Sequence, residues 1–179
     1  MSSQSFPKSF GLLLYPQFEI LDFAGPIEAL NTLARLENDG DKFADITLSV
    51  IAKTMDPVTP GPIAPDTAGV NFSGKQFYLP THTFEDAPQL DFLLVPGGYG
   101  SSKPGMEEAV AYIRRTYKGH EGHKPLQYLM SVCTGAELLA RAGVLDHHTA
   151  TTNKAAWDHV TPLGKKTYWK ADVSTWPRM

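Results

Sequence analysis

Apolar and polar positions divide the chain into short apolar runs and longer amphipathic stretches. The runs at 10–15 and 91–95 are apolar almost throughout, which predicts strands buried on both faces of a parallel sheet. Further strands are predicted at 46–52, 69–72, 81–84, 126–132 and 149–152. Apolar residues that recur every three or four positions predict helices at 23–37, 106–117 and 134–142. Beyond residue 154 the pattern is weak and predicts no element.

Strands that alternate with helices are typical of parallel βαβ units, and therefore of a layered α/β fold. The chain has 179 residues with no repeat or long linker, so we expect a single domain over 1–179. In such sheets, ligands bind beyond the carboxyl ends of the strands. Three turns are predicted at those ends, around Asp22, at 96–100 and at Cys133. These turns are the candidate site.

Composition and charge narrow the class of function. Sixteen basic and nineteen acidic residues give a net charge of −3, which argues against nucleic acid or a membrane surface as a partner. No apolar stretch is long enough to span a bilayer and the first residues carry no secretory signal, so we expect a cytoplasmic protein. The single cysteine makes an intramolecular disulfide impossible and argues against a thiolate-rich metal site.

Cys133 lies between a predicted strand and a predicted helix, in the segment SVCTG. A nucleophile in such a tight turn projects above the sheet, as in the nucleophile elbow of hydrolases. Unpaired N–H groups at the start of the helix favour the thiolate form. Gly135 leaves room there for a substrate or for the opposing backbone. Cys133 is therefore a candidate nucleophile.

The same residues also have purely structural interpretations. Cys133 would suit a buried core position, because cysteine is among the residues most often found inside proteins. Thr134 and Glu137 match the capping-box pattern T-x-x-E. Asp22 would suit the N-cap of a helix that begins at Phe23. From local patterns alone, both sets of interpretations stay open.

Three segments stand out in order along the chain: YPQFEILDFAGP at 15–26, LLVPGGYG at 93–100 and SVCTGAELLARAGVLDHHTATT at 131–152. Together they resemble the ThiJ/PfpI superfamily, whose fold is that of class I glutamine amidotransferases. The combination of LDFAGP with CTG is most similar to the isocyanide (isonitrile) hydratase branch. The resemblance implies a flavodoxin-like three-layer sandwich with a mainly parallel sheet, a homodimer and a small-molecule substrate. The sequence shows no cofactor motif, so we expect no cofactor.

The resemblance also implies roles for individual residues. Cys133 falls on the nucleophile, and Asp22 on the acidic position beside it. Two like charges in a small site resist ionising together, so a carboxyl there keeps a proton that it can donate. Gly98 and Tyr99 fall in the loop whose backbone N–H groups face the reacting centre, and Thr134 matches the threonine after the cysteine. These residues and Gly135 form the predicted catalytic and substrate-binding set.

The chain departs from the superfamily pattern in three places. Proteolytic members carry histidine directly after the cysteine, where this chain has Thr134, which argues against a Cys–His peptidase. Many relatives read ATTHW where this chain reads ATTNK, so Asn153 replaces a histidine. Relatives also continue beyond the segment that ends here at Met179. We therefore expect a fold that lacks the superfamily's C-terminal strand and helix.

The predicted activity is the hydration of a small isocyanide to an N-substituted formamide by a cysteine-dependent lyase. One alternative is a glyoxalase-like or other cysteine-dependent hydrolytic reaction at the same turn. Another is a non-catalytic member that senses redox state or binds a ligand. A transcription regulator is disfavoured, because no helix-turn-helix segment follows the matched region.

Other clusters of polar residues predict no additional site. His120 and His123 in GHEGH, and the adjacent His147 and His148, have no evident third ligand, so we expect solvated histidines and no metal. The segment GGYG at 97–100 lacks the glycine spacing of nucleotide-binding loops. A turn that brings backbone N–H groups towards Cys133 is the favoured interpretation of this segment.

Overall fold

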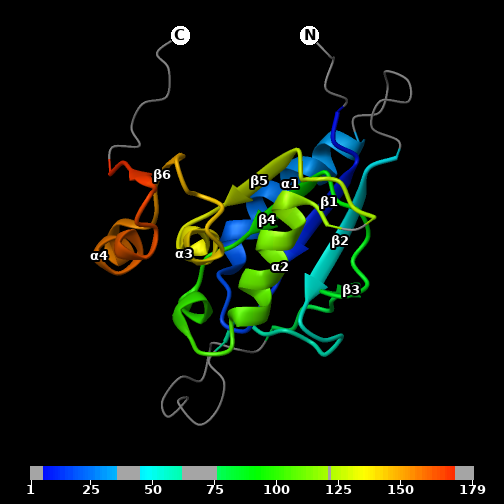
Figure 1. Ribbon diagram of the computed structural model, residues 1–179. Coiled ribbons are helices and arrows are strands. Elements are labelled where there is room, and N and C mark those ends of the chain that lie inside the picture. Colours follow the sequence, from blue (N-terminus) through cyan, green and yellow to red (C-terminus); the bar gives the residue numbers. More distant parts are fainter. Residues whose placement is uncertain (1–5, 36–44, 62–75, 121, 172–179) are drawn as a thin grey trace.

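The computed structural model describes residues 6–35, 45–61, 76–120 and 122–171, and these residues form a parallel sheet covered by helices (Figure 1). Five strands pair in the order β3-β2-β1-β4-β5, and every pair is parallel. They are β1 (Ser9–Leu13), β2 (Thr47–Ala52), β3 (His82–Thr83), β4 (Phe92–Val95) and β5 (Tyr128–Ser131). A separate two-stranded parallel sheet joins β6 (Thr149–Ala150) to β7 (Tyr168–Trp169).

Helices lie on both faces of the larger sheet. They are α1 (Ile20–Arg35), α2 (Glu107–Lys118), α3 (Gly135–Ala142) and α4 (Trp157–Val160), with 3-10 helices η1 (Tyr99–Ser102), η2 (Lys154–Ala156) and η3 (Thr161–Leu163). The connections β1–α1–β2 and β4–α2–β5 run in opposite directions from the middle of the sheet. Right-handed crossovers then place α1 and α2 on opposite faces. In Figure 1, α2 passes in front of the sheet and α1 behind it. The predicted layered α/β fold is confirmed.

The core lies where the two central strands meet the helices. Leu13, Ile51, Leu93 and Val95 have no exposed surface, so the apolar runs of β1 and β4 are buried as predicted. β5 differs, because it is at the edge of this sheet and Tyr128 and Met130 remain 44% and 41% exposed. The candidate site therefore lies at the carboxyl ends of two well-buried strands, β1 and β4, and of the partly exposed edge strand β5.

Several predicted boundaries are wrong by a few residues. β1 ends at Leu13 rather than Tyr15, and α1 begins at Ile20, before the predicted start at Phe23. The predicted strand at 149–152 shortens to two residues, while the strand predicted at 69–72 lies outside the described residues. The short helices and β7 after residue 153 were not predicted, because elements of two to four residues are too short to show a period.

In the part of the chain that the structure describes, no helix has the length and apolar character needed to cross a membrane.

Candidate active site

The carboxyl ends of β1, β4 and β5 bring three predicted residues together at Gly97. A methyl group placed on Gly97 would lie 2.8 Å from Asp22 Oδ2 and 2.8 Å from Cys133 Cβ. The same methyl group would lie 2.6 Å from the backbone nitrogen of Thr134. Only glycine fits where these groups converge. Asp22, Cys133 and Thr134 therefore surround one small volume, although they come from two separate parts of the sequence.

Cys133 is held in a strained backbone conformation between β5 and α3. Its φ is 55°, in the left-handed region that residues other than glycine rarely adopt, at a cost of about 1–2 kcal/mol. The N–H of Gly135 bonds to the carbonyl of Val132 at 2.9 Å and closes the turn. Cys133 itself is partly exposed rather than fully buried. The predicted strand-turn-helix is confirmed, and the buried-core interpretation of this cysteine is wrong.

Asn153 contacts the cysteine from the segment after β6. Its Nδ2 donates to Cys133 Sγ at 3.1 Å, while its Oδ1 accepts from the N–H of Ala155 at 2.8 Å. The second bond fixes the orientation of the amide, so the N–H end faces the sulfur. Thr152 Oγ1 donates to the Cys133 carbonyl at 3.2 Å. The family pattern indicates a missing histidine at Asn153, but no sequence signal indicates that the amide there binds the sulfur.

Asp22 lies inside the first turn of α1 and does not cap it. The helix begins at Ile20, and the Asp22 side chain reaches another strand end, where its Oδ2 accepts from the N–H of Gly97 at 2.8 Å. The N-cap interpretation of Asp22 is therefore wrong. This bond ties the start of α1 to the loop after β4 and directs the carboxyl group towards Cys133.

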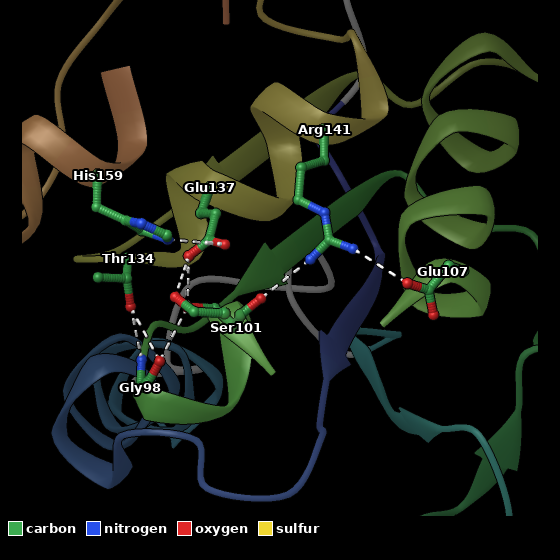
Figure 2. Close-up of polar contacts among 8 residues, drawn as sticks. Gly98, Ser101, Glu107, Thr134, Glu137, Arg141 and His159 are labelled. Atoms are coloured by element: carbon green, nitrogen blue, oxygen red, sulfur yellow. Dashed lines mark hydrogen bonds and ion pairs between the residues drawn. The ribbon is translucent and has the colours of Figure 1, made fainter. Parts of the chain in front are cut away.

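Thr134 and Gly98 bind one another across the site (Figure 2). The N–H of Gly98 donates to Thr134 Oγ1 at 2.9 Å, and Thr134 Oγ1 lies 3.2 Å from the Gly98 carbonyl oxygen, which accepts from it. Thr134 makes no capping bond to α3, and Glu137 binds two serines instead, so the capping-box interpretation is wrong. The Gly98 N–H is engaged by Thr134. Among the described residues, the N–H groups of Cys133 and Thr134 have no acceptor.

Tyr99 and Gly135 each directly follow a residue of the Gly98–Thr134 pair. Tyr99 begins η1, next to Gly98, and the residue is 87% exposed. A methyl group on Gly135 would overlap the carbonyl oxygen of Val95. The space at Gly135 is thus filled by the opposing backbone, which was one of the two predicted reasons for glycine there.

Tyr15 is buried behind the site, just beyond the end of β1. Its hydroxyl donates to the Pro96 carbonyl at 2.6 Å. Burial raises the pKa of Tyr15 far above its usual value, and the nearby negative charges of Asp22, Cys133 and Glu137 raise that pKa further. The hydroxyl therefore stays protonated and fixes the carbonyl just before Gly97. Sequence reasoning missed Tyr15, because its position in an apolar run indicates only burial.

The family can now be assigned. The model of the DJ-1/PfpI family matches residues 8–175 of this chain. The chain belongs to the DJ-1/PfpI family. The resemblance to ThiJ/PfpI proteins, predicted from three short segments, is confirmed.

Curated relatives of this DJ-1/PfpI chain have different functions. It is 33% identical over 154 residues to the isonitrile hydratase of Pseudomonas putida, covering 86% of this chain and 56% of the relative. It is 27% identical over 147 residues to the HTH-type transcriptional regulator GbdR of Pseudomonas aeruginosa, covering 82% of this chain and 34% of that protein. The chain thus spans about half of the first relative and a third of the second.

Solved structures agree on the fold. A THiJ/PfpI family protein from Pseudomonas syringae superposes with a TM-score of 0.62 at 25% identity, over 88% of this chain and 55% of that chain. An AraC family transcriptional regulator from Pseudomonas putida gives a TM-score of 0.65 at 18% identity, over 93% of this chain and 77% of its own. The sheet and its helices are therefore those of the DJ-1/PfpI fold.

The histidine pairs lie away from this DJ-1/PfpI site. His120 and His123 face each other with ring centroids 4.4 Å apart and line a cavity of about 380 Å³ beside Tyr112 and Arg115. His147 and His148 are exposed. Within the described ranges, no group of three or more histidine, cysteine or acidic side chains is placed to hold a metal ion.

We expect Gly135→Ala to destabilise the fold by about 2–4 kcal/mol, because the added methyl group overlaps the Val95 carbonyl. Gly25→Ala is the matched control. Nothing lies within 4 Å of a methyl group at Gly25, and alanine in a helix interior is favoured by about 0.5–1 kcal/mol. Chemical denaturation of both variants measures the difference. Equal midpoints for the two variants would contradict the close approach at Gly135.

We expect Asn153→Asp to slow alkylation of Cys133 by iodoacetamide about tenfold at neutral pH. The substitution replaces the N–H donor to sulfur with an anionic oxygen, and a like charge beside a thiol disfavours the thiolate. Asn31→Asp makes the same change of charge at an exposed position of α1, where Asn31 pairs only with Glu28 among the described residues. That control should react like the parent. An unchanged rate in Asn153→Asp would show that the amide does not act on the thiolate.

Proposed function

We propose that this chain is an isocyanide hydratase, which adds water to a small organic isocyanide and gives an N-substituted formamide. The observation that carries the proposal is the convergence of Asp22 Oδ2 and Cys133 Cβ on Gly97, which supports a carboxyl group and a thiol acting in one site. The isonitrile hydratase at 33% identity supports the same chemistry.

In the proposed reaction, the Cys133 thiolate attacks the terminal carbon of the isocyanide and forms a carbon–sulfur bond. Asp22 transfers its proton to that carbon, which yields a thioimidate, R–N=CH–S, attached to the enzyme. Water then adds its oxygen to the carbon, one of its protons passes to the nitrogen and the other returns to Asp22. The carbon–sulfur bond breaks and releases Cys133 as the thiolate. The product is R–NH–CHO, and Cys133 and Asp22 recover their starting forms.

The surrounding groups suit this sequence of steps. The Asn153 amide would stabilise the thiolate before attack and as the leaving group. The N–H groups of Cys133 and Thr134, which have no acceptor in the part of the chain that the structure describes, would orient the substrate or the water, as donors do in an oxyanion hole. Thr134 Oγ1 is fixed by Gly98, so its hydroxyl has a defined position at the site. The proposed catalytic residues are therefore Cys133, Asp22 and Thr134.

An assay with a simple alkyl isocyanide tests the proposal. Formation of the matching formamide, followed by nuclear magnetic resonance, is the expected result. Consumption of methylglyoxal without formamide formation would favour the glyoxalase-like alternative. If the folded chain turns over neither compound, a ligand-binding role is favoured, and the 27% identity to a transcriptional regulator points to the same alternative. The predicted homodimer and cytoplasmic location stay predictions.

A further inference from the structure

Glu137 is a buried carboxylate one turn beyond the cysteine. Its side chain belongs to α3, and the residue is only 2% exposed. Oε2 accepts from Ser101 Oγ at 3.0 Å and from Ser102 Oγ at 2.7 Å, while Oε1 lies 3.5 Å from Nε2 of His159 on α4 (Figure 2). Burying a carboxylate is costly unless its oxygens are paired, and here Ser101, Ser102 and His159 pair with them. None of the steps proposed above uses Glu137.

The hydrogen-bond donors around Ser101 show how Glu137 affects η1. The Ser101 hydroxyl has a single proton and two acceptors in reach, Glu137 Oε2 and the Gly98 carbonyl at 2.9 Å. The Gly98 carbonyl oxygen has two lone pairs and also accepts from the Ser101 N–H at 3.2 Å, so one lone pair remains for a hydroxyl proton. If Ser101 Oγ donates to Glu137, that lone pair accepts the proton of Thr134 Oγ1. Each hydroxyl then donates once. The carboxylate therefore selects the arrangement in which Thr134 and Gly98 bind one another.

A second contact from α3 holds the same turn. Arg141 Nη1 donates to the Ser101 carbonyl at 3.1 Å, and its Nη2 lies 3.6 Å from Glu107 at the start of α2. Glu137 and Arg141 are one turn apart, so both reach η1 from the same side of α3. Figure 2 shows the two side chains converging on Ser101. Ser101 thus attaches η1 to α3 in two ways. Its hydroxyl donates to Glu137, and its carbonyl accepts from Arg141.

We propose that Glu137 is a positioning residue, which fixes η1 through Ser101 and Ser102 and thereby sets the Gly98–Thr134 pair beside Cys133. The exposed His159 ring lies 3.5 Å from the other carboxylate oxygen of Glu137 and so connects α4 to the same side chain. The effect of Glu137 on turnover rests on the proposed function, in which Thr134 orients the reactants. Its effect on the turn does not depend on that function.

Amide hydrogen exchange tests the effect on the turn. The N–H groups of Gly98, Ser101 and Lys103 are bonded to Thr134, Gly98 and Gly100, so they report on this turn. Glu137→Ala removes the oxygen that accepts from both Ser101 and Ser102, and we expect exchange at these amides to become about tenfold faster or more. Glu137→Gln keeps an oxygen for both serines, and exchange should stay within about threefold of the parent.

The control is Glu108→Gln, which removes an exposed acid on α2 that pairs with Lys53. It should leave exchange at η1 unchanged. If Glu137→Ala loosens the whole fold, amides of β1 and β4 will exchange faster by the same factor. Ser102→Ala then serves instead, because Ser102 is exposed and its loss removes one donor to Glu137 without opening a cavity. We expect about threefold faster exchange at Gly98 and Ser101 in this variant.

Isocyanide turnover supplies the second measurement. Glu137→Ala should lower kcat about tenfold with little change in KM, and Glu137→Gln should restore it. The inference is overturned if Glu137→Gln exchanges as fast as Glu137→Ala, or if neither Glu137→Ala nor Ser102→Ala exceeds Glu108→Gln at η1. If the parent chain turns over no isocyanide, the proposed function fails while the exchange measurements still decide the role of Glu137.

Discussion

Cys133→Ala is expected to abolish isocyanide hydration, with a fall in kcat of about 10⁴-fold or more. The proposed reaction proceeds through a carbon–sulfur bond, and no other thiol exists in the chain. Alanine keeps the Cβ atom and so keeps the same strained turn at φ 55°. The lost activity would therefore reflect the sulfur atom rather than a changed backbone. Formamide production under saturating isocyanide measures the effect.

Chemical modification supplies the matched control for this substitution. Because Cys133 is the single cysteine, iodoacetamide should inactivate the parent chain in step with the addition of one label, and should not label the variant. Circular dichroism and thermal unfolding show whether the variant is folded. A folded variant that retains more than about a hundredth of the parental turnover would contradict covalent catalysis by this cysteine.

The elements at the centre of the fold could be predicted from the sequence. The apolar runs of β1 and β4 are buried strands, and the turn from β5 to α3 places Cys133 at its centre. These features depend on contacts between near neighbours and on burial, which hydrophobic patterns report directly. The boundaries moved by a few residues, because helix and strand ends are decided by turns and by tertiary hydrogen bonds.

The contacts between chemical groups could not be predicted in the same way. Asp22 binds the N–H of Gly97, which lies 75 positions away, because the sheet order places β4 beside β1. Asn153 reaches Cys133 from a segment with no hydrophobic period. The resemblance to the family predicted that Asp22 and Cys133 belong to one site, whereas the pattern of residues supplied no distance between them.

Two local patterns were misleading for a shared physical reason. Asp22 matches a helix N-cap, and Thr134 with Glu137 matches a capping box. Each side chain instead bonds to a turn that is distant in sequence, namely Gly97, Gly98 or the serines of η1. The side-chain oxygens that cap helices are the same chemical groups that bind backbone N–H groups at an active site. A residue at the start of a helix near a sheet edge can therefore serve either purpose. The tertiary partner decides which one.

Asp22→Asn is expected to lower kcat about 10²–10⁴-fold with a small effect on KM. Asparagine has nearly the same shape, and its Oδ1 can still accept from the N–H of Gly97. The amide cannot transfer a proton to the carbon of the isocyanide, so the step that forms the thioimidate loses its acid. Steady-state kinetics with one alkyl isocyanide separate kcat from KM. Alkylation by iodoacetamide shows in parallel that Cys133 remains reactive.

The control for this substitution is Glu28→Gln on the same helix. Glu28 is exposed and pairs with Arg35 at 3.3 Å, so its loss removes one negative charge from α1 without touching the site. Parental kinetics are expected. If Asp22→Asn also turned over within about threefold of the parent while Cys133→Ala was inactive, the proton would have to come from another donor. Asp22 would then serve only to hold the N–H of Gly97.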